Sequence, residues 1–265
     1  MKEKKRLFSK AVLALCLTLV CWFPSKADIL RGDVDLDGMV SISDVSSLID
    51  YLLNGTWDDE NVTPTDDHEW VDLGLPSGTL WATCNVGADS PEEYGDYFAW
   101  GETEPKEVYT WSTYKWCVTK ENDEFDMLTK YTDVYFGSIV DNKTELDPED
   151  DAAFVNWGAS WRMPTRDQYE ELFNNCSSQW TALNGVDGRL LTGPNGNTLF
   201  LPFGGRITDT SHIKANDEGN YWLRTLVPSN QIFAFLLYFG SSNCSFPGTY
   251  RYTGMTVRAV RITQN

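Results

Sequence analysis

One twelve-residue segment near the start of the chain, residues 33–44, constrains its folding more than any other. It reads Asp-Val-Asp-Leu-Asp-Gly-Met-Val-Ser-Ile-Ser-Asp, with carboxylates at positions 1, 3, 5 and 12. Gly38 stands at position 6, where a loop that wraps a calcium ion has to turn sharply. Calcium takes six to eight oxygen ligands, and this spacing directs several carboxylates at a single point. The sequence therefore predicts a calcium site.

The predicted calcium ligands all come from this loop. Met39 is expected to offer its backbone carbonyl, and Ser41 to reach the ion directly or through water. The last position departs from the usual pattern, because Asp44 stands where a bidentate glutamate is normally found. The predicted ligands are Asp33, Asp35, Asp37, Met39, Ser41 and Asp44. The alternative is an acidic, solvated turn that binds no ion.

A short helix is predicted directly after the loop. Apolar residues recur at helical spacing over residues 44–53, and Asn54-Gly55 then ends the helix. Residues 32–55 resemble one dockerin type I repeat, the calcium-folded module that carries cellulosomal enzymes. The resemblance implies a cohesin-like or other protein partner, although a full dockerin has two such repeats and we find one here.

The first 27 residues have the layout of a cleaved export signal. Basic side chains precede an apolar run over residues 11–23, which is too short to span a bilayer as a stable helix. Ser25-Lys26-Ala27 places small residues where a signal peptidase cuts. We expect the mature chain to begin near Asp28 and to lie in the periplasm, at the cell surface or outside the cell. No later run predicts a transmembrane segment.

The net charge limits the classes of partner that we expect for the chain. The chain has 21 basic and 39 acidic side chains, a formal net charge of −18. Such a polyanion is repelled by nucleic acid, so we expect no nucleic-acid partner.

Four cysteines follow the export signal, and export permits disulfides in three possible pairings. They are Cys84, Cys117, Cys176 and Cys244. A domain of this length can also fold without any disulfide.

Three segments follow the signal peptide at residues 1–27. Residues 28–55 form the dockerin-like calcium repeat, and residues 56–67 form an acidic linker without periodicity. Residues 68–265 are long enough for one sizeable domain.

This large domain is predicted to be α+β with much loop. Strands are expected at residues 70–75, 79–86, 189–192, 197–201, 231–239 and 255–262. One helix is expected to begin at Asp147-Pro148 and to run to Trp157. A second is expected to begin with a capping box formed by Thr165 and Gln168.

Several phrases of the large domain are distinctive together. They are WATCNVGA (81–88), YGDYFAWGET (94–103), WRMPT (161–165), YW (221–222) and VRAVR (257–261). With them, residues 68–265 resemble the Fibrobacter succinogenes major paralogous domain, found in exported proteins of gut Bacteroidetes. The resemblance implies a loop-rich, C-type-lectin-like fold with short antiparallel sheets and about two helices, related to the formylglycine-generating enzymes. The family has no settled activity to transfer.

Relatives of that fold group provide negative tests. Calcium-dependent sugar-binding lectins use a Glu-Pro-Asn type triplet and a Trp-Asn-Asp triplet. This chain has Glu104-Pro105-Lys106 and no Trp-Asn-Asp. Formylglycine-generating enzymes need two closely spaced cysteines near the C-terminus, where this chain has Cys244 alone. The sequence supports neither chemistry.

Candidate site residues in the large domain come from aromatics and carboxylates. Trp100, Glu102 and Trp222 are our candidates for ligand binding, although tryptophans more often build the core of a loop-rich domain. Glu102 and Glu104 are the first pair to test for glycoside hydrolysis. His68 and His212 are expected in exposed loops, and we predict no catalytic residues.

The sequence favours an exported, non-catalytic, calcium-binding protein. In this hypothesis a dockerin-like tether joins a lectin-like binding or scaffold domain, with glycan as a candidate ligand, near the surface of a polysaccharide-degrading bacterium. One alternative is a polysaccharide-degrading hydrolase that carries a dockerin repeat. Another is a structural surface adhesin.

Overall fold

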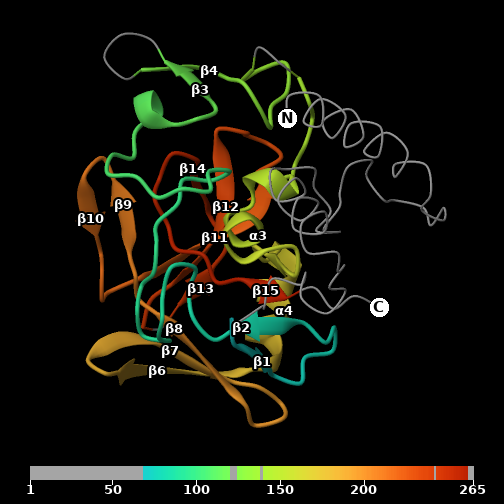
Figure 1. Cartoon of the computed structure of the whole chain (residues 1–265), viewed down its shortest axis with the longest axis vertical. Coiled ribbons are helices and arrows are strands. Elements are labelled where there is room, and N and C mark those ends of the chain that lie inside the picture. Colours follow the sequence, from blue (N-terminus) through green and yellow to red (C-terminus); the bar gives the residue numbers. More distant parts are fainter. Residues whose placement is uncertain (1–67, 120–123, 138–139, 242, 262–265) are drawn as a thin grey trace, which may run out of the picture. The chain divides into compact units, whose positions relative to one another are not determined.

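Short antiparallel strands dominate the described part of the chain (Figure 1). The computed structural model describes residues 68–119, 124–137, 140–241 and 243–261. These all belong to residues 66–265, the second of two units into which the chain divides. The predicted export signal, calcium repeat and linker lie outside the described residues.

The first sheet joins segments from opposite ends of this unit. Its strand order is β1-β2-β15-β5, and every pair is antiparallel. The strands are β1 (Trp70–Asp72), β2 (Leu80–Ala82), β5 (Trp161–Arg162) and β15 (Val260–Arg261). Figure 1 shows teal β2 beside red β15. The sheet therefore depends on contacts between residues that are far apart in the sequence.

The second sheet is built from two consecutive hairpins. Its order is β6-β7-β8, with strands β6 (Ser177–Leu183), β7 (Val186–Thr192) and β8 (Thr198–Pro202). Asn184 and Gly185 form the turn between β6 and β7 and have φ values of 51° and 86°. A two-residue turn with both φ values positive matches the twist of the flanking strands, and Asn-Gly is the preferred pair for it.

The third sheet is organised around β12, which pairs with β11, β13 and β14. Its strands are β11 (Gly219–Leu226), β12 (Phe233–Phe239), β13 (Cys244–Ser245) and β14 (Gly248–Tyr250). Two small ribbons complete the β-structure. They are β3 (Cys117–Thr119) with β4 (Phe125–Leu128), and β9 (Arg206–Thr208) with β10 (Ser211–Ile213).

Two α-helices lie among the described residues, α3 (Ala152–Trp157) and α4 (Arg166–Asn175). No helix in this part of the chain is long and apolar enough to cross a membrane. The predicted capping box of α4 is confirmed. The Thr165 hydroxyl accepts from the Gln168 amide at 3.2 Å, and the Gln168 side chain accepts from the Thr165 amide at 2.9 Å.

The helix predicted to start at Asp147 begins four residues later. Asp147 instead precedes a single 3-10 turn, η3 (Pro148–Asp150). Asp151 then caps α3 and accepts from the amides of Ala153 at 2.9 Å and Phe154 at 3.1 Å. Pro148 begins the 3-10 turn, but Asp151 rather than Asp147 accepts hydrogen bonds from the free amides at the start of α3.

Strands of the first and third sheets carry core residues on both faces. Along β11, Tyr221 and Leu223 belong to one buried cluster, whereas Trp222 belongs to another. Along β2, Trp81 and Ala82 divide in the same way. Successive side chains point to opposite faces of a strand. Burial of both faces explains why large apolar residues stand side by side in these strands, as in Tyr221-Trp222-Leu223 and Leu80-Trp81-Ala82.

The predicted α+β, C-type-lectin-like class is wrong for the described residues, which are mostly β. Several small antiparallel sheets account for the regular structure, with two short α-helices beside them. Most of the strands that sequence analysis missed are three residues long or shorter, and most of them pair with a strand that is next to them along the chain. Strands this short do not show enough alternation of apolar and polar residues to be recognised. The predicted half-EF-hand repeat lies outside the described residues.

Candidate functional site

Three carboxylates converge at the 3-10 turn η3. Asp147, Glu149 and Asp150 each place a carboxylate oxygen within 4.8 Å of the others. The turn brings them together through two backbone hydrogen bonds, from the Asp150 amide to the Asp147 carbonyl and from the Asp151 amide to the Pro148 carbonyl, each at 3.1 Å. Asp150 is buried, Asp147 is half-buried and Glu149 is exposed. This acidic triad could hold a metal ion, and nothing in its geometry selects calcium.

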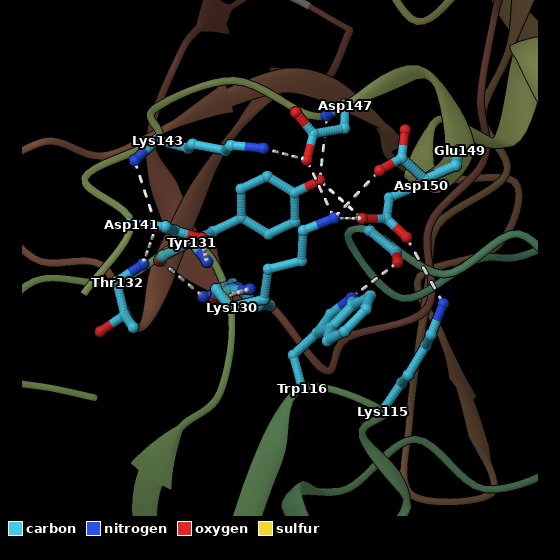
Figure 2. A network of polar contacts seen from close by, with 12 residues as sticks. Lys115, Trp116, Lys130, Tyr131, Thr132, Asp141, Lys143, Asp147, Glu149 and Asp150 are labelled. Atoms are coloured by element: carbon cyan, nitrogen blue, oxygen red, sulfur yellow. Dashed lines mark hydrogen bonds and ion pairs between the residues drawn. The ribbon is translucent and has the colours of Figure 1, made fainter. Parts of the chain in front are cut away.

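The ammonium group of Lys130 lies at the centre of the acidic triad (Figure 2). Its Nζ is 2.6 Å from Asp150, 2.9 Å from Asp147 and 3.4 Å from Glu149. Burial alone would lower the pKa of Lys130, but its hydrogen bonds to Asp150 and Asp147 outweigh burial and raise it. The ammonium group of Lys130 therefore supplies a positive charge between the three carboxylates.

Two further lysines complete the charge balance. Lys143 lies 2.6 Å from Asp147, and Lys115 lies 3.4 Å from Asp150. Burial alone would raise the pKa of Asp147, but the hydrogen bonds and charges of Lys143 and Lys130 lower it overall. Three carboxylates thus face three ammonium groups, and the network is formally neutral.

Neutral groups fix the position of Lys130. The Tyr131 hydroxyl donates to Asp150 at 2.6 Å and accepts from the Asp147 amide at 2.9 Å. Asp141 accepts from the amides of Tyr131 and Thr132 at 2.7 and 2.9 Å, which holds the backbone that carries Lys130 (Figure 2). The network joins residues 130–132 to η3 and stabilises two loops against each other.

The chain has no recognised relatives among the proteins compared. No family model, curated protein or solved structure matches it.

The structure places the predicted ligand-binding residues inside the domain. Trp100 and Trp222 are fully buried. The indole N–H of Trp100 donates a hydrogen bond to the Leu223 carbonyl, and that of Trp222 donates to the Phe98 carbonyl, both at 2.8 Å. Neither ring face is open to a ligand, so both act as core residues. The predicted calcium ligands Asp33, Asp35, Asp37, Met39, Ser41 and Asp44 lie outside the described residues.

Glu102 is also occupied by structural contacts. Its carboxylate accepts from the Lys106 ammonium at 2.8 and 2.9 Å and from the Lys115 amide at 2.7 Å. Glu104, the second member of the predicted hydrolase pair, is exposed. The structure therefore holds Glu102 in an ion pair that orders its loop.

The two histidines lie in different surroundings. His68 stacks on Trp157 with ring centroids 3.9 Å apart and lines a pocket of about 270 Å³. Glu69, Asp89 and Cys84 share this pocket, and its acidic wall disfavours anions. His212 is exposed as predicted, but it lies on β10 rather than in a loop, and its Nε2 lies 2.7 Å from the Gly204 carbonyl.

All four cysteines of the large domain are free thiols. Sequence analysis left their pairing open, and none of the three pairings occurs here. The described core is built without disulfides, as its size allows.

An aromatic surface lies where η1 (Trp111–Thr113) approaches β4 and the segment after β14. It consists of Trp111, Phe125, Tyr250 and Tyr252, all half-buried or exposed. Trp111 is 4.9 Å from the Phe125 ring and 4.9 Å from the Tyr252 ring, between centroids. Tyr250 and Tyr252 stack nearly parallel at 5.4 Å.

Sequence analysis missed this aromatic surface, although one signal was present. In Tyr250-Arg251-Tyr252, the two tyrosines flank a single residue, so in extended backbone they share a face. In the structure Arg251 is fully buried and Tyr250 is 41% exposed. The backbone after Tyr250, however, forms a turn closed by a hydrogen bond from the Thr253 amide to the Tyr250 carbonyl at 3.0 Å, so the alternation of an extended strand does not account for the stacked tyrosines. The position of Trp111 could not be read in the same way. It depends on η1, where Thr113 accepts from the Thr110 amide at 3.2 Å.

Proposed function

We propose that the chain is an exported, non-catalytic binding protein whose large domain binds carbohydrate through the aromatic surface. The observation that carries this proposal is the contiguous grouping of Trp111, Phe125, Tyr250 and Tyr252 at the surface of the domain. Other exposed rings, Trp70, Tyr135 and Trp180, are not part of this group. Contiguous exposed aromatic groups mark binding sites. The face of an aromatic ring carries negative charge density, which attracts the C–H groups of a sugar ring.

The Asp151 carboxyl has a raised pKa but is not placed to serve hydrolysis. A glycosidase needs one carboxyl group with a raised pKa beside the scissile bond. Burial raises the pKa of the Asp151 carboxyl to about 6. That carboxyl, however, is buried and accepts from the amides of Ala153, Phe154 and Met163. It stabilises the start of α3 and does not reach a surface where a substrate would bind.

Carbohydrate binding is tested with the full chain on a panel of soluble polysaccharides, by affinity electrophoresis and then calorimetry. Trp111→Ala and Tyr250→Ala are each expected to weaken binding about five- to tenfold, because a stacked ring contributes about 1 kcal/mol. Trp70→Ala is the matched control. Trp70 is 46% exposed on β1 and lies outside the aromatic surface, so its removal should change nothing. The proposal fails if no polysaccharide is retained, or if the three variants bind alike.

We further propose that residues 28–55 fold around calcium and tether the protein to a partner, as the dockerin-like pattern suggests. Three carboxylates in one loop repel each other without a cation, and a helix of about ten residues is marginal alone. With one loop and Asp44 in place of glutamate, we expect a dissociation constant on the order of 10⁻⁴ M.

Calcium titration of the full chain by calorimetry distinguishes the two acidic clusters. Asp33→Ala combined with Asp37→Ala should abolish binding, because two of the predicted ligands are lost. Glu149→Gln removes the exposed carboxylate of the acidic triad and should leave binding unchanged, because Lys130 already neutralises that cluster. If Glu149→Gln abolishes calcium binding and the double variant does not, the calcium site lies in the acidic triad.

A further inference from the structure

The strand β6 leaves one long edge of its sheet without a partner. All seven of its residues pair with β7, in continuous register from Ser177↔Thr192 to Leu183↔Val186. Within the described residues β6 pairs with no other strand, and Figure 1 shows it as the outermost strand of its sheet. In an antiparallel pair, alternate residues direct their N–H and C=O groups away from the partner. One edge of β6 therefore offers a row of backbone donors and acceptors.

Proteins usually prevent an unpaired strand edge from pairing with another chain, and β6 lacks the features that commonly do so. Charged side chains, proline and β-bulges are the common protection. The strand reads Ser-Ser-Gln-Trp-Thr-Ala-Leu, and its pairing with β7 contains no bulge. Five of its seven residues are exposed, including Trp180 at 50%. By contrast, the long strand β11 is covered on its open side by bridges to Glu145 and Thr256.

The strand is also held in a fixed shape. The Asn184-Gly185 turn closes its hairpin, and the Asn184 side chain donates to Glu92 at 2.6 Å. Arg189 on β7 donates to the Ser178 hydroxyl at 2.9 Å. A strand that is already ordered loses little conformational entropy when it gains a partner.

Charge indicates which partner fits. The chain carries a net charge of −18, so two copies repel each other over most of their surface. Residues 172–186 contain no Asp, Glu, Lys or Arg, and β6 lies inside this neutral segment. The side chains of β6 itself therefore present no like charge to a second copy, and the nearest acidic residues lie on the neighbouring strand and at the hairpin turn.

We propose that β6 pairs antiparallel with β6 of a second copy, with the two-fold axis at Trp180. This register places Trp180 opposite Trp180, Gln179 opposite Thr181, and Ser178 opposite Ala182. The two sheets join into one continuous sheet of six strands. Because the contact uses the same patch on both copies, it closes at a dimer and does not propagate into a filament. The inference is independent of carbohydrate binding.

Sedimentation velocity of the full chain tests the proposed dimer. The wild type should change from monomer to dimer over about 1 to 100 μM, the range of a modest interface. Trp180→Lys should remain monomeric, because it places two ammonium groups opposite each other across the two-fold axis. Trp180→Glu should also remain monomeric, and an equimolar mixture of the two variants should restore the dimer.

The matched control is Val155→Lys, which adds the same charge at an exposed apolar residue of α3 and should dimerise like the wild type. Circular dichroism melts confirm that each variant is folded. Three results would overturn the proposal: a wild type that is monomeric throughout, a dimer that persists in Trp180→Lys, or a mixture of the two charge variants that stays monomeric. Capture of an extended peptide by a monomeric wild type would show that the edge serves a different partner.

Discussion

Replacing Arg251 with methionine should lower the free energy of unfolding by about 4 kcal/mol, or prevent folding. The guanidinium is fully buried and donates to the Tyr114 hydroxyl at 2.8 Å and to the carbonyl of Lys130 at 3.1 Å. It also donates to the carbonyls of Tyr131 and Gln231 at 3.2 and 3.3 Å. Methionine fills part of the volume but leaves these four groups without a donor, at about 1–3 kcal/mol for each group that stays unsatisfied.

Denaturant melts of the Arg251 variants measure this loss. Arg251→Lys should also be strongly destabilised, because a single ammonium cannot reproduce the planar array of five donors. Arg206→Met is the matched control. Arg206 forms one half-exposed ion pair with Glu218 at 3.2 Å, and its loss should cost less than about 1 kcal/mol. If Arg251→Met loses no more free energy of unfolding than Arg206→Met, the hydrogen bonds of the buried guanidinium do not stabilise the fold as inferred.

Replacing Lys130 with methionine should cost about 3 kcal/mol, because it leaves the acidic triad without its central cation. Asp150 is buried and cannot be hydrated in compensation. Added calcium at millimolar concentration should restore part of the lost stability in this variant, since a cation that binds only the folded state stabilises it. Thermal melts with and without calcium measure both effects.

The matched control for Lys130 is Lys143→Met. Lys143 contacts Asp147 alone at 2.6 Å and is more exposed than Lys130, so its loss should cost less than about 1 kcal/mol. Calcium should stabilise Lys130→Met by more than it stabilises Lys143→Met. Equal stability of the two variants would mean that the acidic triad does not depend on the central ammonium group. An equal response to calcium would mean that the triad cannot accept a metal ion in its place.

Local sequence signals predicted local structure well. The capping box of Thr165 and Gln168 opens α4 as expected, because both partners lie within one turn. The apolar run at residues 231–239 predicted β12 for a similar reason. Asn184-Gly185 is an equally local signal for the hairpin of β6 and β7, and sequence analysis overlooked it because β6 itself is polar.

The function of individual tryptophans could not be predicted from the sequence. Trp100 and Trp222 bond to carbonyls more than 120 residues away, so their burial depends on the tertiary fold. Trp111 looks no different in sequence, yet it lies at the surface. The pairing of Lys130 with Asp150 is similarly non-local. The α+β class failed for a different reason, because most of the strands that were missed are too short to show an alternating pattern in the sequence.

The position of β15 has a consequence for how the molecule is made. Among the strands of the described residues β15 is the last along the chain, yet it lies between β2 and β5 in the first sheet. Its partner β2 lies near the start of the described part, so the sheet cannot close until almost the whole domain has been translated. Loss of β15 would leave β5 without a partner and β2 paired only with β1, and the incomplete sheet would make the product sensitive to proteolysis.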